Sequence, residues 1–347
     1  MKKLIILLSI LIVFISFSDE NLSNQYAQTI TKDDLLEHLA FLSNDNMRGR
    51  LTGSKEQKLA AHYIAENFAH NNLSKINIWI NDSTQIRSYY QKFYCKEYFG
   101  GRYSAMINPT TENINSKGAI ATENVLGFIE GTDKKDEIIV ISAHYDHIGM
   151  NGGVVFNGAD DDSSGMAAML EIAQAFAQAK KDGHSSRRSI LFIAFTGEEQ
   201  GLLGSDYYTQ VPIFPLMNTV CDLNIDMVGR IDRNHKKIHD YVYLIGSDKI
   251  STNLHELSEK INHSTINLKL DYTYNSVTDP LQLYYRSDHF NFAKIGIPII
   301  FYTSGLHPDY HESTDDLEKI DFDILQKRTQ LIFHTTWEIA NREQGLN

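Results

Sequence analysis

The residues in this sequence best suited to chemistry are carboxylates and histidines that stand at the ends of apolar runs. Glu198 and Glu199 are neighbours and follow the apolar run 188–195. Because two adjacent carboxylates repel each other, their position calls for a cation or a proton-transfer role. The other such residues are His144 and Asp146, Asp160, Asp161 and Asp162, Asp226, and His307 and His311. Carboxylates and imidazoles without thiolates are typical ligands of hard or borderline divalent cations.

The apolar runs themselves predict strands that would bring these residues together. A helix rich in Ala is predicted over 163–181, and the runs cover 137–144, 188–195, 218–226, 240–246 and 296–303. Strands alternating with helices predict a three-layer α/β fold (αβα), with helices on both faces of a mixed, mostly parallel central sheet. In open sheets of this kind, ligands bind at the carboxyl ends of the strands. We therefore expect a metal site at these strand ends.

Two amphipathic helices are predicted before this core. One covers residues 31–43 with Thr31 as its N-cap, and the other covers 54–73 with Ser54 at its start. Apolar side chains at helical spacing are expected on one face of the second helix: Leu59, Tyr63, Ile64 and Phe68. From about residue 74 to 130 the pattern changes to short strands and turns.

The first residues have the three parts of a signal peptide. Lys2 and Lys3 supply the positive charge, residues 4–17 are apolar, and Ser16 and Ser18 are small residues before a cleavage point. We expect cleavage after residue 18 and export to the periplasm or out of the cell. An uncleaved membrane anchor is the alternative, because the apolar run is only a little shorter than a membrane span.

The remaining residues are expected to form one catalytic domain, 19–347. Its helical N-terminal part would cover 19–75 and its α/β core 76–347, and the polar stretch 19–30 is expected to be mobile. A formal net charge of −12 argues against nucleic acid as a partner, because phosphate binding needs basic patches. No stable membrane association is expected after signal cleavage, and the oligomeric state stays open.

The two cysteines, Cys95 and Cys221, are too few for a thiolate zinc site. An exported protein could pair them, but their separation in sequence leaves this open. Several enzyme classes are excluded by absent motifs. The sequence has no GxSxG nucleophile elbow, no phosphate loop, no GxGxxG and no HExxH.

Five motifs, taken together, resemble the di-zinc aminopeptidases of metallopeptidase family 28, which are related to glutaminyl cyclases. The resemblance covers roughly residues 120–330 and includes the order and spacing of the motifs. They are "SAHYDHIG", "NGADDDSSGMAAMLEIAQAF", "FIAFTGEEQGLLGS", "NIDMVGR" and "YRSDHFNFAKIGIPIIFYTSGLHPDYHESTDD".

The resemblance implies a set of ligands for two Zn²⁺ ions. His144 and Asp226 resemble the ligands of one zinc, and Asp161 resembles the carboxylate that bridges both. Glu199 and His311 resemble the ligands of the second zinc. The same sites could also take cobalt or manganese.

The resemblance also implies three residues that act beside the metals. Glu198 resembles the general base, and Asp146 resembles the carboxylate that orients His144. Tyr310 matches a position where some members carry a tyrosine that stabilises the tetrahedral intermediate.

Other polar residues in the motifs have simpler expectations. Asp160 and Asp162 are expected to be turn and cap residues. His307 competes with His311, and the context "DYHESTDD" favours His311. Packing or hydrogen bonding is the only role expected for His147 and His289, and a place at the substrate entrance is expected for Arg286, Ser287 and Asp288.

The function implied is that of an exported zinc aminopeptidase, which removes N-terminal residues from peptides with a free N-terminus. Water activated by the metals would attack the peptide bond, with a glutamate as general base. One alternative is a glutaminyl cyclase, an acyltransferase that uses one zinc on the same scaffold. A non-catalytic homologue is the other alternative, although the complete ligand set and Glu198 speak against it.

Overall fold

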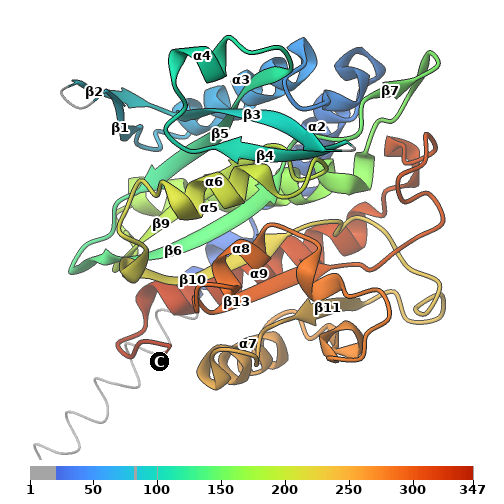
Figure 1. Cartoon of the computed structure of the whole chain (residues 1–347). Helices are drawn as coiled ribbons and strands as arrows, with labels where there is room; N and C mark the ends of the chain where they lie inside the picture. Colours follow the sequence, from blue (N-terminus) through green and yellow to red (C-terminus); the bar gives the residue numbers. More distant parts are fainter. Residues whose placement is uncertain (1–20, 82–83, 100, 347) are drawn as a thin grey trace, which may run out of the picture.

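The computed structural model describes residues 21–81, 84–99 and 101–346. The predicted signal peptide, 1–18, lies outside these described residues. At the centre of the molecule is a nine-stranded sheet with helices on both faces (Figure 1). Its strands, in their order across the sheet, are β12 (Lys269–Asp271), β11 (Tyr241–Ile245), β13 (Ile299–Thr303), β10 (Thr219–Ile225), β6 (Lys134–His144), β9 (Arg188–Phe195), β5 (Ala119–Ile129), β3 (Tyr90–Phe99) and β4 (Arg102–Met106).

Strands β13, β10, β6 and β9 run parallel to one another, so their carboxyl ends meet at one edge of the sheet. β5, β3 and β4 continue the sheet with antiparallel pairing, and β11 pairs antiparallel with β13 and parallel with β12. The predicted mixed α/β sheet is therefore confirmed, with parallel pairs making up half of it. Strands joined by short turns pair antiparallel, which accounts for β3 and β4.

The helices form the outer two layers. On one face lie α2 (Lys32–Leu42), α3 (Lys55–His70), α5 (Gly165–Lys181), α7 (Thr252–Ser264) and α9 (Phe322–Asn341), and on the other lie α6 (Leu203–Gln210) and α8 (His289–Ala293). Successive side chains of β6 pack against the helices on opposite faces of the sheet. Ile139 and Ile141 pack toward the first face, and Ile138 and Val140 toward the second. Each fully buried aliphatic side chain of this kind contributes about 1.5–3 kcal/mol.

The remaining elements lie around this core. They are the hairpin of β1 (Ile76–Asn81) and β2 (Thr84–Ser88), the hairpin of β7 (Met150–Asn151) and β8 (Val154–Val155), the short helix α4 (Thr111–Ile114), and the turns η1 (Asp45–Arg50), η2 (Ala159–Ser164), η3 (Leu216–Asn218), η4 (Thr273–Asn275), η5 (Leu283–Tyr285) and η6 (Leu317–Lys319).

The two predicted N-terminal helices are confirmed by their caps. Thr31 accepts a hydrogen bond from the amide of Asp34, and Ser54 accepts one from the amide of Gln57. The predicted apolar face of α3 is right for Ile64 and Phe68, which are buried. It is wrong for Leu59, which is 53% exposed, because this residue lies on the side of the helix opposite the buried Ala61 and Ile64.

The expectation of a mobile stretch before α2 is wrong for its described part. Residues 21–27 are helical, and Tyr26 and Ile30 are buried in the main core. Tyr26 stacks on Trp337 of α9, so this polar sequence is held by the few apolar side chains in it.

Cys95 and Cys221 are both buried and do not form a disulfide. Among the helices of the described residues, none has the length and apolar character needed to cross a membrane.

Candidate metal and catalytic site

The predicted site residues meet at the carboxyl edge of the four parallel strands. His144 is the last residue of β6, and Asp226 directly follows β10. Asp161 lies in η2, just before α5. Glu199 follows β9, and His311 lies in the loop after β13. The alternation of strands and helices therefore brings together ligands from five separate segments.

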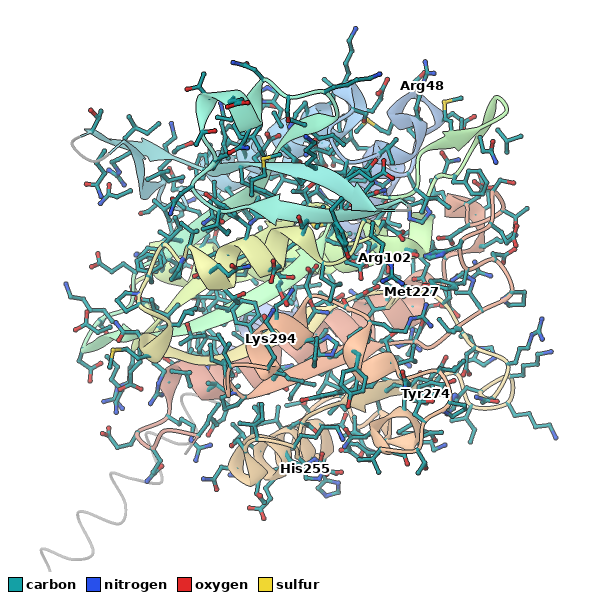
Figure 2. The ribbon with its side chains drawn as sticks, viewed as in Figure 1. Arg48, Arg102, Met227, His255, Tyr274 and Lys294 are labelled. Atoms are coloured by element: carbon teal, nitrogen blue, oxygen red, sulfur yellow. The ribbon has the colours of Figure 1, made fainter. Side chains whose placement is uncertain are left out.

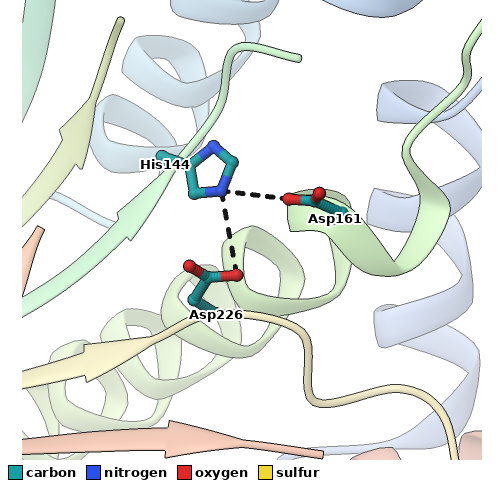
Figure 3. A group of neighbouring side chains, drawn as sticks. All are labelled: His144, Asp161 and Asp226. Atoms are coloured by element: carbon teal, nitrogen blue, oxygen red, sulfur yellow. Dashed lines mark ion pairs between the residues drawn. The ribbon is translucent and has the colours of Figure 1, made fainter. Parts of the chain in front are cut away.

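Three of these side chains form a first group, shown in Figure 3. His144 Nε2 lies 3.2 Å from Asp161 Oδ1 and 3.8 Å from Asp226 Oδ1. All three residues are buried. Two ligands at about 2.0–2.1 Å from one zinc ion, at tetrahedral angles, are about 3.3 Å apart. The group therefore has the residue types and the spacing to hold a divalent cation.

A second group shares Asp161 with the first. His311 Nε2 lies 3.2 Å from Asp161 Oδ2 and 3.2 Å from Glu199 Oε2. The two oxygens of Asp161 thus face two different imidazoles, as a bridging carboxylate would. His307 does not join either group, because its Nε2 lies 3.2 Å from Asp160 Oδ2 instead.

His147 also reaches the second group, where the sequence predicts only packing or hydrogen bonding for it. Its Nδ1 lies 2.7 Å from Glu199 Oε1 and 3.9 Å from Asp161 Oδ2. The side chain is completely buried. The signal in the sequence is its place three residues after the end of β6, in the same motif as His144.

Asp160 and Asp162 have the turn and cap roles predicted for them. Asp162 Oδ1 accepts hydrogen bonds from the amides of Gly165, at the start of α5, and Met227, while Oδ2 accepts from the amide of His144. Asp160 Oδ1 accepts from the amide of Gly229. These two acids tie the ends of β6, β10 and α5 to the turn that carries Asp161.

Asp315 is a supporting residue that no motif in the sequence predicts. Its Oδ2 accepts hydrogen bonds from the amides of both Asp160 and Asp161, at 3.0 Å each. Burial raises its pKa to about 6. It fixes the turn around the shared carboxylate from the far side of the loop that carries His311.

Asp146 supports the site differently from the prediction. The Nδ1 atom of His144 hydrogen-bonds the main-chain carbonyl of Asp146, at 3.1 Å, and lies 3.8 Å from its carboxylate. That carboxylate instead accepts hydrogen bonds from the Thr52 hydroxyl, at 2.8 Å, and from the Glu198 amide, at 3.2 Å. Asp146 therefore orients His144 through its backbone and holds the Glu198 segment through its side chain.

Arg50 is a buried cation behind the site and was also missed. Its guanidinium donates hydrogen bonds to the carbonyls of Leu42, Tyr145, Asn157 and Gly158. The last three carbonyls belong to the two segments that carry His144 and Asp161. Burial lowers the pKa of Arg50 to about 10, against the opposing effect of the nearby carboxylates.

Glu198 lies among other carboxylates, and its pKa is strongly shifted. Burial raises its pKa well above the usual range, and the nearby carboxylates of Glu199 and Asp226 raise it further, although His144 opposes them. Gly197, with φ of 71°, provides the left-handed turn just before it, and a Cβ there would meet Leu203 at 2.9 Å. A carboxylate whose pKa is raised is a stronger base than an ordinary glutamate, which suits a general base.

The acids and histidines of the site stabilise each other's charged forms, which shifts their pKa values. Burial alone would lower the pKa of His311, but Asp161 and Glu199 raise it to about 10. Burial alone would raise the pKa of Asp161, but His144 and His311 hold it well below its usual value. Cation binding would replace these protons, as is usual for imidazole and carboxylate sites.

Buried polar atoms that lack a hydrogen-bond partner also indicate that the site can bind cations. Asp161 Oδ2, Glu199 Oε1 and both ring nitrogens of His147 are buried without a hydrogen-bond partner among the described residues. Buried polar atoms are rarely left unpaired in native proteins. The donor set therefore fits divalent cations.

A small pocket opens beside these groups. Asp161, Glu198 and Asp226 form its polar side, and its apolar walls are Met227 (labelled in Figure 2), Leu283, Phe301 and Leu306. Tyr310 and Arg286 lie at its mouth, where an Arg286 Nη2–H donates a hydrogen bond to the Tyr310 hydroxyl oxygen at 2.9 Å. Burial raises the pKa of Tyr310, so its hydroxyl keeps its proton and can donate it.

Of the three residues expected at the entrance, only Arg286 is there. Ser287 and Asp288 are buried, and Asp288 accepts a hydrogen bond from the Ser205 hydroxyl. The expectation was wrong for these two because the start of α8 turns them toward the sheet. His289 has the structural role expected of it: it hydrogen-bonds the Tyr284 carbonyl, and burial lowers its pKa to about 3.

The comparison with protein families agrees with this geometry. The model of peptidase family M28 matches residues 124–336, which is more than half of the chain. The chain belongs to peptidase family M28. The resemblance seen in the sequence motifs is thereby confirmed.

Individual proteins of known activity or structure are also similar to this chain, at modest sequence identity. Aminopeptidase YwaD of Bacillus subtilis is 26% identical over 231 residues, which are 64% of this chain and 46% of YwaD, so the chain spans about half the length of this relative. A zinc aminopeptidase structure from Bacillus subtilis matches with a TM-score of 0.64 and 19% identity, covering 91% of this chain and 97% of that one. Porphyromonas gingivalis glutaminyl cyclase matches with a TM-score of 0.61 and 17% identity, covering 88% and 97%. These two structures show that the fold is shared.

Proposed function

We propose that this M28 protein is a zinc-dependent aminopeptidase that removes N-terminal residues from peptides. The observation that carries the proposal is the shared Asp161, whose two oxygens face His144 on one side and His311 on the other at 3.2 Å each. With Asp226 and Glu199 these residues would hold two cations side by side. The aminopeptidase relatives support the choice of reaction.

The proposed cations would supply two things when bound: a water of lowered pKa as the nucleophile and polarisation of the peptide carbonyl. Glu198 is the proposed general base. Its raised pKa suits a group that takes a proton from water and returns it to the leaving amine. The backbone of Glu198 is fixed by Asp146, which keeps the carboxyl group at the edge of the site.

Tyr310 is the proposed donor to the developing oxyanion. Because Arg286 donates to the oxygen of this hydroxyl, the hydroxyl hydrogen is free to point toward the substrate. The cluster of carboxylates around Asp161 and Glu198 would attract the free α-ammonium group of a peptide. The apolar walls at Met227 and Phe301 support an apolar N-terminal side chain in the pocket.

We also propose that the protein is exported, with a signal peptide over 1–18 and a single catalytic domain over 19–347. The three-part leader in the sequence supports this. Locating the mature protein and comparing its N-terminus with residue 19 tests the proposed export and the proposed signal peptide. A mature protein that begins at Met1 and stays in the cytoplasm would contradict them.

The proposed activity is tested by offering three substrates to the zinc-loaded protein. Leucine p-nitroanilide has a free amine, its N-acetyl form has none, and a peptide with N-terminal Gln is a substrate for cyclisation. We expect release of nitroaniline from the first substrate only. Cyclisation of the Gln peptide without hydrolysis would instead show a glutaminyl cyclase, and no reaction with any substrate in a panel of aminoacyl groups would show a non-catalytic protein.

A further inference from the structure

His147 lies among the predicted metal ligands but is not one of them. It is fully buried, and neither ring nitrogen has a hydrogen-bond partner in the described part of the chain. Buried polar groups usually have a partner in the chain or in something bound to it. An unpaired imidazole inside a candidate metal site therefore points to a partner that the chain itself does not supply.

Its nearest polar neighbours are unpaired as well. Nδ1 of His147 lies 2.7 Å from Glu199 Oε1 and 3.9 Å from Asp161 Oδ2. One ligand atom from each of His147, Asp161 and Glu199 lies within 4.8 Å of the other two, and neither Asp161 Oδ2 nor Glu199 Oε1 has a hydrogen-bond partner among the described side chains. Three orphaned atoms of the types that bind zinc thus face one small volume.

The short contact between His147 and Glu199 is not an aligned hydrogen bond. At 2.7 Å the two atoms are close enough for one, yet both remain unpaired because an N–H on the ring would not point at the oxygen. Two atoms that bind the same cation do not point at each other. Two ligands of one tetrahedral zinc ion lie about 3.3 Å apart, so these two atoms would move about 0.6 Å farther apart when they bind one.

Glu199 has one oxygen for each of two imidazoles. Oε2 lies 3.2 Å from His311 Nε2, while Oε1 lies beside His147. The rings of His147 and His311 approach edge to face, with centroids 6.1 Å apart, so they reach Glu199 from different sides. The main chain of His147 is held by a hydrogen bond from its amide to the Arg50 carbonyl, at 3.4 Å.

We propose that His147 Nδ1 is an additional ligand of the second cation, together with His311, Glu199 and the shared Asp161. This inference rests on the proposed two-cation site and adds a ligand to it. The second site then has two imidazoles, whereas the first has only His144. Because imidazole suits zinc, nickel and copper better than magnesium or manganese, the second site should favour the former more strongly than the first site does.

The test is stepwise binding of Co²⁺ to the metal-stripped full chain, followed by chelator competition and by the visible absorption of bound Co²⁺. Three variants are compared with the wild type: H147A, H147N and the control H334N. The asparagine amide keeps an N–H near the position of Nδ1 but does not replace an imidazole ligand. His334 is a similarly buried histidine on α9.

We expect H147A and H147N to bind the first Co²⁺ with wild-type affinity and the second more than about 100-fold more weakly. That loss exceeds the usual effect of removing an outer-shell partner. The absorption of the second Co²⁺ should also change, whereas H334N should match the wild type. The inference is overturned if H147N binds the second ion with wild-type affinity and spectrum, because a hydrogen-bond donor would then be sufficient.

A measurement on the unmodified protein covers the case in which the variants do not fold. X-ray absorption at the zinc edge counts imidazoles around the bound metal. Three ligating histidines over two zinc ions give an average of one and a half imidazoles per zinc, and an average of one contradicts the proposal. A wild-type chain that binds no cation would contradict the proposed function itself, whereas two bound ions with unaffected variants would contradict only the role of His147.

Discussion

At the scale of single residues, the adjacent acids Glu198 and Glu199 have different surroundings. Glu199 has imidazoles on both of its oxygens, and these hold its pKa below the usual value against the effect of burial. Glu198 lies among carboxylates that raise its pKa in the same direction as burial does. Neighbouring residues in one tight turn can therefore serve as a ligand and as a base.

The substitution Glu198→Gln separates these two roles. It removes the proton acceptor while keeping the size of the side chain, so we expect turnover to fall by about 10²–10⁴-fold. The zinc content should stay at the wild-type level. The matched control is Glu199→Gln, which should lose zinc as well as activity. Loss of zinc from the Glu198 variant, or near-normal turnover in it, would show that the two roles are assigned the wrong way round.

At the scale of elements, the site depends on loops that are fixed by the segment before α3. The guanidinium of Arg50 binds four main-chain carbonyls, and Thr52 binds the carboxylate of Asp146. Both residues come from the segment between α2 and α3. The N-terminal helices therefore form part of the support of the site, in addition to covering one face of the sheet.

The substitution Arg50→Lys tests this support. A lysine ammonium group cannot reach four carbonyls in different directions, and each buried acceptor left unpaired costs about 1–3 kcal/mol. We expect the free energy of unfolding, measured in urea, to fall by at least about 3 kcal/mol. Arg48→Lys is the control, because the Arg48 side chain is 60% exposed and lies at the surface in Figure 2. Equal stabilities of the two variants would rule out the role of Arg50.

The extent of sequence-based prediction also differs by element. Strands such as β9 could be predicted because residues 190–195 form a continuously apolar run, and the whole of Arg188–Phe195 is indeed buried. The ligands at strand ends could be predicted because parallel strands bring their carboxyl ends to one edge. Arg50 and Asp315 could not, because they act through main-chain atoms of distant segments, and no spacing in the sequence encodes such contacts.

At the scale of the whole molecule, the first and last helical segments are joined by a buried polar contact. The Ser23 hydroxyl lies 2.7 Å from Nδ1 of His334, on α9. Burial lowers the pKa of His334 to about 4, so the histidine is neutral in the folded protein. The unfolded chain, with a pKa near 6.5, takes up a proton that the folded protein excludes.

This difference predicts a pH dependence of stability. Because the pKa of His334 is lower in the folded state, its effect is absent above about pH 6.5, and stability falls as the pH drops from 6.5 toward 4. The loss reaches about 3 kcal/mol once the pH is below the folded pKa. We expect metal-stripped H334Q to lose less stability over this window than the metal-stripped wild type, as measured in urea.

The control for the pH dependence is H62Q, which removes a histidine with a mostly exposed side chain. This variant should follow the wild type over the whole window. Parallel pH profiles of H334Q and the wild type would contradict the neutral, buried state of His334.

The central claim is that catalysis by this M28 protein depends on two cations held around Asp161. The most direct test is the rate of leucine p-nitroanilide hydrolysis by the metal-stripped chain as zinc is added back in measured equivalents. We predict no activity in the stripped protein and a rise that levels off near two zinc ions per chain. Full activity in protein that has been shown to be free of metal would contradict the account.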